Sequence, residues 1–326
     1  MKKILSFLIL YFCSLLFAPL QQGNYGFEAA ANLASNTGKH DAFSPCDSKK
    51  TIEETDDSLK NLWDDEASKI SSVNWEQEEI YPGVYYGYHH FANLFGGPQS
   101  ISVIDLNMNS AKAEVKFVWT EGRELTSILA QKAGALAAVN GTFFDMEKGG
   151  SIEYLKIANS VIDTTSDPND IRDNGALSIS KKKEIRMLKI PSDNSWRTFD
   201  TISAYPDIMA AGPVLLDNFM KVPQSFKNTA RHPRTLVGLT SDNHLKLITV
   251  DGRSPMAEGM SVFELQVLSL TLACKDAINF DGGGSTTMWI AGKPNNGVVN
   301  YPCDNKIFDH AGERECANII AIIPRK

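Results

Sequence analysis

The chain has 326 residues, of which 43% are hydrophobic and 22% are charged, a composition typical of globular proteins rather than of disordered or multi-span membrane chains. Its 39 acidic and 32 basic residues give a net charge of -7, and the sequence has no lysine- or arginine-rich block that would follow a nucleic-acid backbone. We therefore expect no nucleic-acid partner. The length fits either about two domains or one large domain with an N-terminal extension.

The first residues predict a secretory signal. Lys2 and Lys3 precede an apolar run from Ile4 to Ala18, whose 15 residues fall short of the roughly 20 that a membrane-spanning helix needs. We assign residues 1–31 to a signal peptide region, with an uncleaved anchor as the alternative, and Pro19 leaves the cleavage site open. This predicts a secreted or periplasmic protein with no membrane span after cleavage.

An acidic segment is predicted next, over residues 32–79. Twelve acidic residues and four lysines lie between Asp41 and Glu79. Such a stretch is typical of a solvated helix or linker ahead of the main domain, and an acidic recognition tail is the alternative. We place the main domain over residues 80–326.

The main domain is predicted to be rich in short strands separated by turns, with two amphipathic helices. Three strand pairs are typical of hairpins, over residues 101–106 with 113–119, 177–179 with 185–188, and 236–239 with 245–250. The first helix is predicted to begin with Thr126 as N-cap and to end at Gly134 in the C′ position, before a buried strand over 135–139. In the second helix, Ser261 and Glu264 have the spacing of a capping box, and a strand over 277–280 follows.

Four cysteines remain outside the apolar leader, and in an oxidising compartment they allow three disulfide pairings. We favour Cys303 with Cys316, because they flank a short polar loop and closing a loop of about 15 residues contributes roughly 3 kcal/mol. Cys46 would then pair with Cys274, and free buried thiols are the alternative. These cysteines and the six histidines show no CxxC or HxxxH spacing, so we expect no zinc site.

Three polar clusters follow predicted strands, where a sheet presents side chains to a ligand with little backbone freedom. The first, Asn140 to Asp145, fits a binding turn as well as an ordinary one. The second brings Arg234 and Arg253 to the outer ends of one hairpin. Two guanidinium groups held together bind a phosphate or a carboxylate through bidentate hydrogen bonds, and a surface ion-pair network is the alternative. We interpret the neighbouring His232 as a structural or exposed histidine.

The third cluster, Asp281 to Ser285, gives the strongest local signal because it lies between a buried strand and another apolar run, unlike a flexible linker. Its three glycines allow backbone N–H groups to form an anion-binding nest, and the strand end makes Asp281 a candidate acid, base or nucleophile. A weaker group near the C-terminus contains Glu313 and Arg314, for which a surface turn is the alternative.

These clusters resemble the motifs of the phosphodiester glycosidase family. Asn140 to Asp145 resembles N-G-x-F-[FY]-D, Pro233 to Thr235 resembles P-R-T, and Asp251 to Arg253 resembles D-G-R. Asn279 to Thr287 is similar to N-[LF]-D-G-G-G-S-T-T, and Glu313 to Asn318 is similar to E-R-x-[VC]-x-N. The resemblance covers about residues 80–326. It departs at two positions without chemical roles, Phe280 and Cys316.

The resemblance implies an α+β fold with mixed, strand-rich sheets partly wrapped by helices around one catalytic cavity. It also implies hydrolysis of the glycosidic C–O bond of a sugar 1-phosphodiester, for example an alpha-N-acetylglucosaminyl one, on envelope or extracellular glycans. Attack on phosphorus commonly uses paired metal ions, and this sequence has no histidine-rich cluster. A departing phosphate needs charge stabilisation, which arginines provide. We expect no cofactor or metal, although a bound ion is left open.

The resemblance also suggests roles for individual residues. Asp281 would be the first catalytic carboxylate, and Asp251 or Glu313 the second. The two arginines and the glycine-rich backbone would hold the phosphate, while the asparagine and aspartate of the first cluster would orient the sugar. The predicted substrate-binding residues are Asn140, Asp145, Arg234, Arg253, Gly282, Gly283, Gly284, Ser285 and Thr286.

Two other functions are compatible with the same residues. One is a phosphodiesterase that cuts the P–O bond, and the other is a non-catalytic envelope protein that binds phosphoglycans. A hydrolase using Ser285 as nucleophile is disfavoured, because no G-x-S-x-G elbow surrounds this serine.

Overall fold

The structure is a computed structural model that describes residues 63–165, 172–190, 204–224 and 229–325. The chain divides into two compact units, Met1–Ser72 and Val73–Lys326. In the first unit, residues 63–72 are helical. The predicted signal peptide and most of the predicted acidic segment lie outside the described residues.

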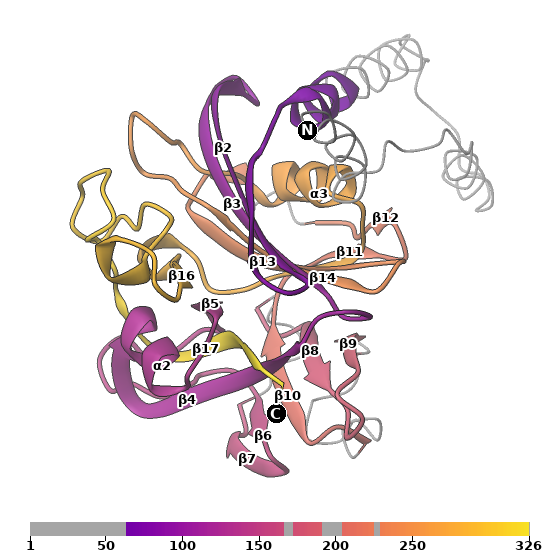
Figure 1. The fold of residues 1–326 in the computed structure, drawn as a ribbon, viewed down its shortest axis with the longest axis vertical. Coiled ribbons are helices and arrows are strands. Elements are labelled where there is room, and N and C mark those ends of the chain that lie inside the picture. Colours follow the sequence, from indigo (N-terminus) through magenta and orange to yellow (C-terminus); the bar gives the residue numbers. More distant parts are fainter. Residues whose placement is uncertain (1–62, 166–171, 191–203, 225–228, 326) are drawn as a thin grey trace, which may run out of the picture. The chain divides into compact units, whose positions relative to one another are not determined.

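The largest sheet of the second unit has eight strands in the described part of the chain, and all its neighbouring pairs are antiparallel (Figure 1). In spatial order they are β1 (Glu76–Tyr81), β2 (Val84–Leu94), β3 (Gly97–Asn107), β14 (His244–Val250), β13 (Arg234–Thr240), β15 (Cys274–Asn279), β11 (Val214–Asp217) and β12 (Met220–Lys221). Because β1 begins at Glu76, this sheet starts inside the segment predicted to end at residue 79.

Two smaller sheets complete the strands of the described residues. One contains β7 (Ser160–Asp163), β6 (Leu155–Ile157), β10 (Asp207–Ala211), β8 (Gly175–Ile179) and β9 (Ile185–Lys189). The other contains β16 (Met288–Ile290), β5 (Ala137–Asn140), β17 (Glu315–Pro324) and β4 (Ala113–Leu125). Their pairs are also antiparallel. The strand-rich prediction is confirmed, whereas the expected mixed sheets are antiparallel throughout the described residues.

One hydrophobic core is shared by the three sheets. It includes Val237 from the eight-stranded sheet, Leu177 from the five-stranded sheet and Phe117 from the four-stranded sheet. Helix α2 (Thr126–Lys132) packs on the four-stranded sheet through a second cluster that contains Leu129 and Ile319. Helix α3 (Val262–Thr271) lies against β11 and β15 (Figure 1). The loops at the strand ends are thus carried by sheets with a common interior.

The helix ends agree with the predictions except at the start of α2. The capping box of Ser261 and Glu264 is confirmed in α3, and Gly134 follows the C-cap of α2 with φ 64° as predicted. The N-cap of α2 is Leu125 rather than Thr126, and it makes no side-chain cap bond. Among the described residues, no helix has the length and apolar character needed to cross a membrane.

Two of the three predicted hairpins are confirmed, β8 with β9 and β13 with β14. The hairpin predicted over 101–106 and 113–119 is wrong, because β3 pairs with β2 and β14 while β4 pairs with β17 in another sheet. Asn107 still forms a turn, since its side-chain oxygen accepts hydrogen bonds from the N–H groups of Asn109 and Ser110. That turn carries the chain from one sheet to another.

The predicted disulfides are not formed. Cys274, Cys303 and Cys316 are free thiols, and Cys46 lies outside the described residues. Cys316 is buried in β17, whereas the half-buried Cys303 interacts with Arg253. Flanking one loop therefore does not bring these two sulfur atoms together, because their side chains are held by different parts of the structure.

Candidate active site

A pocket of about 400 Å³ lies where β13 begins and β15 ends, in the interior of the eight-stranded sheet, and its volume is within the usual range of small-molecule sites. Its lining residues are Phe143, Arg172, Gly212, Pro213, His232, Arg234, Arg253, Val262, Asn279, Phe280, Asp281, Gly282, Gly283 and Arg314. Four arginines and a single carboxylate in this lining create a positive potential. The pocket therefore favours an anionic ligand.

Strand register explains why residues far apart in the sequence meet at these strand ends. Arg234 begins β13 opposite Val250, the last residue of β14, so the segment 251–253 leaves the sheet beside it. Leu236 pairs with Asn279, the last residue of β15, so Asp281 lies just beyond the end of β15 and close to the start of β13. The second and third predicted clusters are thus brought together by antiparallel pairing.

Arg234 and Arg253 have no carboxylate within 4.0 Å in the described part of the chain. Arg234 is instead held by backbone carbonyls, since its Nε donates to Met260 O at 3.0 Å and its Nη2 to Ala230 O at 3.2 Å. Burial, together with the nearby charge of Arg253, lowers the pKa of Arg234 to about 10. Two close guanidinium charges without acidic partners favour a bound anion.

The other two arginines of the pocket already have acidic partners. Arg314 donates from Nε and Nη2 to Asp304 Oδ1 at 3.0 and 2.5 Å. Arg172 lies 3.8 Å from the buried Glu153 carboxylate. Their charges are therefore largely compensated, but both still lower the pKa of Asp281.

Asp281, which lines the pocket, is held in place through its backbone. Its N–H donates to Gly141 O at 3.2 Å and its carbonyl accepts from Asn140 Nδ2 at 2.7 Å. Burial raises the pKa of the Asp281 carboxyl, and the bond from the Gly282 N–H and the charges of Arg314 and Arg172 oppose this rise only in part. A carboxylate with a raised pKa, positioned in a pocket, is suited to general-base or nucleophilic chemistry.

The glycine run is required for packing arginine side chains. A Cβ on Gly283, whose φ is 62°, would lie 3.0 Å from Arg253 Nη2, and one on Gly284 would lie 2.3 Å from Arg314 Nη2. The amides of this run are mostly used internally, because Gly282 N donates to the Asp281 carboxylate at 2.9 Å and Gly283 N to Pro233 O at 2.9 Å. The segment thus acts as a cradle for guanidinium groups more than as the predicted anion nest.

Several predicted substrate-binding residues lie behind the pocket. Ser285 and Thr286 are 1% exposed, and Asn140 is fully buried. The Asn140 side-chain oxygen accepts from Thr235 Oγ1 at 2.7 Å and from Thr287 N at 3.2 Å. In this position Asn140 supports Asp281 and does not line the pocket.

Asp145 also lies outside the pocket lining. Its side chain accepts hydrogen bonds from the N–H groups of Glu147 and Lys148 at 2.8 and 2.9 Å, and these bonds lower its pKa. This is the pattern of an Asx turn. Asn140 and Asp145 thus make scaffold and turn contacts, whereas Phe143 of the same cluster lines the pocket. The contact of Asn140 and Asp145 with the sugar stays a prediction.

Neither candidate for the second carboxylate lines the pocket. Asp251 is 1% exposed, and its Oδ1 accepts from Asn300 Nδ2 at 2.8 Å and Tyr301 N at 3.0 Å. Glu313 accepts the Ser127 N–H at 3.0 Å, so it caps the start of α2 from a distant part of the sequence. Asp281 remains the one carboxylate in the lining formed by the described residues.

Four lining residues carry chemistry that the predicted site does not include: Phe143, Arg172, His232 and Arg314. Phe143 and Arg314 lie within the motifs quoted above, so their positions were a usable signal. Burial, Arg234 and Arg253 together lower the pKa of His232, and its buried Nδ1 lacks a hydrogen-bond partner among the described residues. Arg172 follows no recognisable pattern in the sequence.

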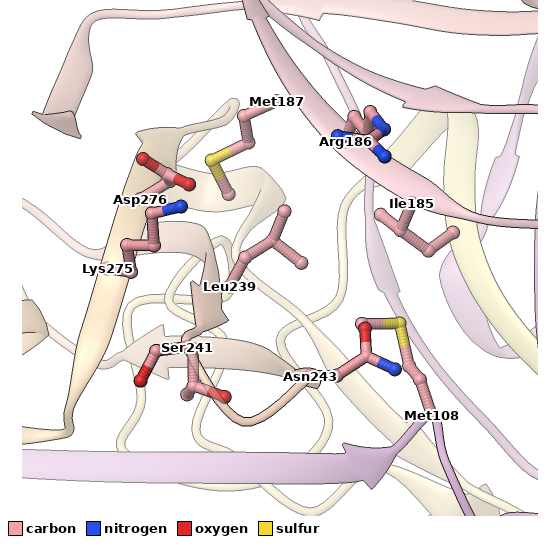
Figure 2. A pocket seen from close by; sticks show the side chains of 10 residues that line it. Met108, Ile185, Arg186, Met187, Leu239, Ser241, Asn243, Lys275 and Asp276 are labelled. Atoms are coloured by element: carbon pink, nitrogen blue, oxygen red, sulfur yellow. The ribbon is translucent and has the colours of Figure 1, made fainter. Parts of the chain in front are cut away.

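A second pocket, of about 260 Å³, lies at the opposite end of β13 and β15 (Figure 2). Its lining combines Met108 and Met187 with the charged residues Arg186, Lys275 and Asp276. Asp276 is engaged, since its Oδ1 accepts the Asn218 N–H at 2.8 Å. None of the predicted site residues contributes to this pocket.

Solved structures share this fold at low sequence identity. The catalytic domain of zebrafish N-acetylglucosamine-1-phosphodiester alpha-N-acetylglucosaminidase, auto-inhibited by its pro-peptide, is 18% identical with a TM-score of 0.58, over 81% of this chain and 92% of that one. A putative exported protein of Burkholderia pseudomallei K96243 is 13% identical with a TM-score of 0.58, over 77% and 96%. A hypothetical protein from Synechocystis is 14% identical with a TM-score of 0.54, over 74% and 62%.

Sequence comparisons match shorter stretches. An uncharacterized SPbeta prophage-derived protein of Bacillus subtilis (strain 168), YomE, is 40% identical over 68 residues, which is 21% of this chain and only 11% of the length of that relative. The family model for phosphodiester glycosidases matches residues 133–323, a range that contains every residue of the arginine-rich pocket. The chain belongs to the phosphodiester glycosidase family.

Proposed function

We propose that the protein hydrolyses the glycosidic C–O bond of a sugar 1-phosphodiester and releases a free sugar and a phosphomonoester. The observation that carries this proposal is the pocket in which Arg234 and Arg253 lack acidic partners and lie beside Asp281. A phosphodiester would supply the missing negative charge. An N-acetylglucosaminyl phosphodiester is the first substrate to test, because the zebrafish relative is named for that activity.

The arginine pair would act mainly on the leaving group. As the C–O bond breaks, the phosphate monoanion becomes a dianion, and charge-assisted bonds to fixed guanidinium groups stabilise the dianion more than the monoanion. The neutral imidazole of His232 would add a hydrogen-bond donor at the same place.

Asp281 would act at the anomeric carbon, either as the base for an attacking water or as the nucleophile. Most glycosidases use two carboxylates, one of which protonates a poor leaving group. A phosphate leaves with little need for a proton, so one carboxylate is sufficient when arginines stabilise the product. This division of work agrees with a lining that contains Asp281 and four arginines.

We further propose that the enzyme acts outside the cytoplasm, on envelope or extracellular glycans such as an exopolysaccharide. The apolar leader from Ile4 to Ala18, preceded by Lys2 and Lys3, supports this location. Retention of the mature protein in the cytoplasmic fraction after cell fractionation would contradict it.

Hydrolysis of alpha-N-acetylglucosaminyl 1-phosphodiesters in ¹⁸O-labelled water tests the reaction directly. We expect the label in the anomeric hydroxyl of the released sugar. Label in the phosphate would instead identify a phosphodiesterase that cuts P–O. Binding of several glycosyl phosphodiesters without any turnover would identify a phosphoglycan-binding protein.

A further inference from the structure

Asp251 combines features of a catalytic group with a location that excludes contact with the substrate. Burial raises the pKa of its carboxyl to about 6, near the range that favours general acid–base catalysis. The side chain is nevertheless 1% exposed and outside the pocket lining. Its role therefore has to be found in the groups it touches.

Those groups belong to the start of the segment 300–314, here called the C-terminal loop. Asp251 Oδ1 accepts from Asn300 Nδ2 at 2.8 Å and from Tyr301 N at 3.0 Å. Asn300 is fully buried, and its side chain also accepts from Met288 N at 2.7 Å and donates to Thr286 O at 3.1 Å. The end of β14 is thus tied to the beginning of the loop.

The loop is closed on itself beyond this anchor. Tyr301 stacks on Phe308 with ring centroids 4.1 Å apart and on His310 at 4.4 Å. His310 Nδ1 lies 2.6 Å from Asn300 O, and Asp304 N donates to Gly312 O at 3.1 Å. A displacement of residue 301 would therefore move the whole loop.

The same loop reaches two arginines of the pocket. Asp304 binds Arg314 through two hydrogen bonds at 3.0 and 2.5 Å. The nearby charge of Arg253 opposes the rise that burial causes in the pKa of the Cys303 thiol, and Arg253 lies only two residues after Asp251 in the sequence. Asp251 is therefore linked to the two arginines in two ways: through the loop that it anchors, and through its own chain segment, which continues to Arg253.

We propose that Asp251 is a positioning residue that anchors the C-terminal loop and thereby sets the positions of Arg253 and Arg314 at the phosphate site. The inference rests on the proposed function, because it assigns the loop to phosphate binding. It replaces the role of second catalytic carboxylate that the motif resemblance suggests for this residue.

The conservative substitution separates the two roles. In Asp251→Asn the side-chain carbonyl still accepts both N–H groups, but the amide cannot exchange a proton as an acid or base. In Asp251→Ala the shared acceptor Oδ1 is lost, so the Tyr301 N–H and one N–H of the Asn300 amide lose their partner. Positioning therefore predicts that asparagine rescues what alanine removes, whereas acid–base catalysis predicts that both variants are equally inactive.

The experiment measures kcat and KM for an alpha-N-acetylglucosaminyl 1-phosphodiester, with inorganic phosphate as competitive inhibitor. For Asp251→Ala we expect kcat/KM to fall and the phosphate inhibition constant to rise, each at least tenfold, on the scale of one or two lost charge-assisted bonds. Part of the loss should be in kcat, because the arginines stabilise the departing dianion more than the bound diester. For Asp251→Asn we expect kcat, KM and the phosphate inhibition constant within about threefold of wild type. Amide hydrogen exchange should become faster across 300–314 in the alanine variant only.

Two further variants control for misfolding and for the loss of an unrelated carboxylate. Tyr301→Ala removes the ring stacking but keeps the backbone N–H that donates to Asp251, and we expect it to lower kcat/KM severalfold, even if Asp251→Ala does not fold. Asp242→Ala is the matched control, because its side chain is 75% exposed at the tip of the β13–β14 hairpin.

Two results would overturn the inference. If Asp251→Asn slowed turnover by about 100-fold or more with KM unchanged, Asp251 would be a catalytic residue. Unchanged kcat/KM, phosphate inhibition constant and loop exchange in Asp251→Ala would show that Asp251 does not anchor the loop. If the wild type cleaves no glycosyl phosphodiester, the proposed function is wrong, but that result does not test the role of Asp251. Loop exchange and calorimetric phosphate binding would still test the anchor.

Discussion

Strands β13, β14 and β15 belong to one sheet, but buried charged side chains are paired at one end of these strands and unpaired at the other. At the pocket end, Arg234 and Arg253 lack carboxylate partners among the described residues. At the other end, the Asp105 carboxylate contacts both His244 Nδ1, at 2.6 Å, and Lys246 Nζ. Charge is compensated where it serves the fold, and it is left open where a ligand is expected.

The two ends also differ in what burial does to a carboxyl group. Burial alone would raise the pKa of Asp105, but the bonds from His244 and Lys246 outweigh it and the pKa is lowered. For Asp281, burial dominates and the pKa is raised. A perturbed carboxyl beside unpaired cations is a stronger sign of function than a buried ion pair, since structural networks keep their members ionised.

Asp281→Asn should have the largest effect on activity. The amide can neither attack nor accept a proton, so we expect kcat to fall by about 10² to 10⁴, the range for loss of a positioned base. Steady-state kinetics with a glycosyl 1-phosphodiester measures it, and the exposed Asp242→Asn serves as control. Turnover within threefold of wild type would remove Asp281 from the mechanism and leave the pocket as a binding site.

Asp105→Asn should affect stability instead. It removes the charge of Asp105 from its ion pair with Lys246, which is 3% exposed, and breaking a buried pair in this way costs about 3–5 kcal/mol. We expect a lower urea midpoint, with kcat and KM unchanged for the enzyme that remains folded. A specific loss of turnover in a fully folded variant would erase the distinction between the two ends.

Arg234→Gln should weaken phosphate binding. It removes one of the two unpaired guanidinium groups, and a charge-assisted hydrogen bond contributes about 1.5–3 kcal/mol, so we expect kcat/KM to fall roughly 10- to 100-fold. Arg186→Gln, at the opposite pocket, is the matched control. Equal effects of the two substitutions would show that overall charge, rather than the unpaired arginines, attracts the substrate.

The sequence predicts the chemistry of this site better than its geometry. One short turn joins β13 and β14, so the approach of Arg234 to Arg253 was within reach. Asp281 is brought to the same place by the pairing of β15 with β13 across the segment that contains α3. The pairing of β4 with β17 was not within reach, because it joins residues about 200 positions apart and no local pattern encodes such contacts. The same long-range pairing gives Glu313 its place at the start of α2.

The cysteines show the same limit. An even number in a secreted chain allows a disulfide framework, but only side-chain direction decides whether two thiols meet. Cys316 is buried in β17 with its sulfur 3.4 Å from Thr126 Oγ1, whereas the half-buried Cys303 lies near the charge of Arg253. Arg172 was missed for another reason: it lines the pocket but lies outside every motif in the sequence.

The pH dependence of kcat/KM should carry the signature of the raised pKa of Asp281. A base or nucleophile must be ionised, so activity should fall tenfold per pH unit once the pH drops below a pKa that lies above the ordinary value of 3.8. Arg314→Gln should move this acid limb to higher pH, because Arg314 lowers the pKa of Asp281. A limb that stays in place would show that another group titrates.

Lys275→Ala should have the smallest effect. Lys275 lines the pocket at the far end of the sheet (Figure 2), and if that end is structural, kcat/KM should stay within about twofold, since surface substitutions away from a site change little. A rise in KM by tenfold or more for a polymeric substrate, with a short substrate unaffected, would mean that a second part of a longer glycan binds there. The two ends of the sheet would then be two substrate-binding subsites, and neither end would be purely structural.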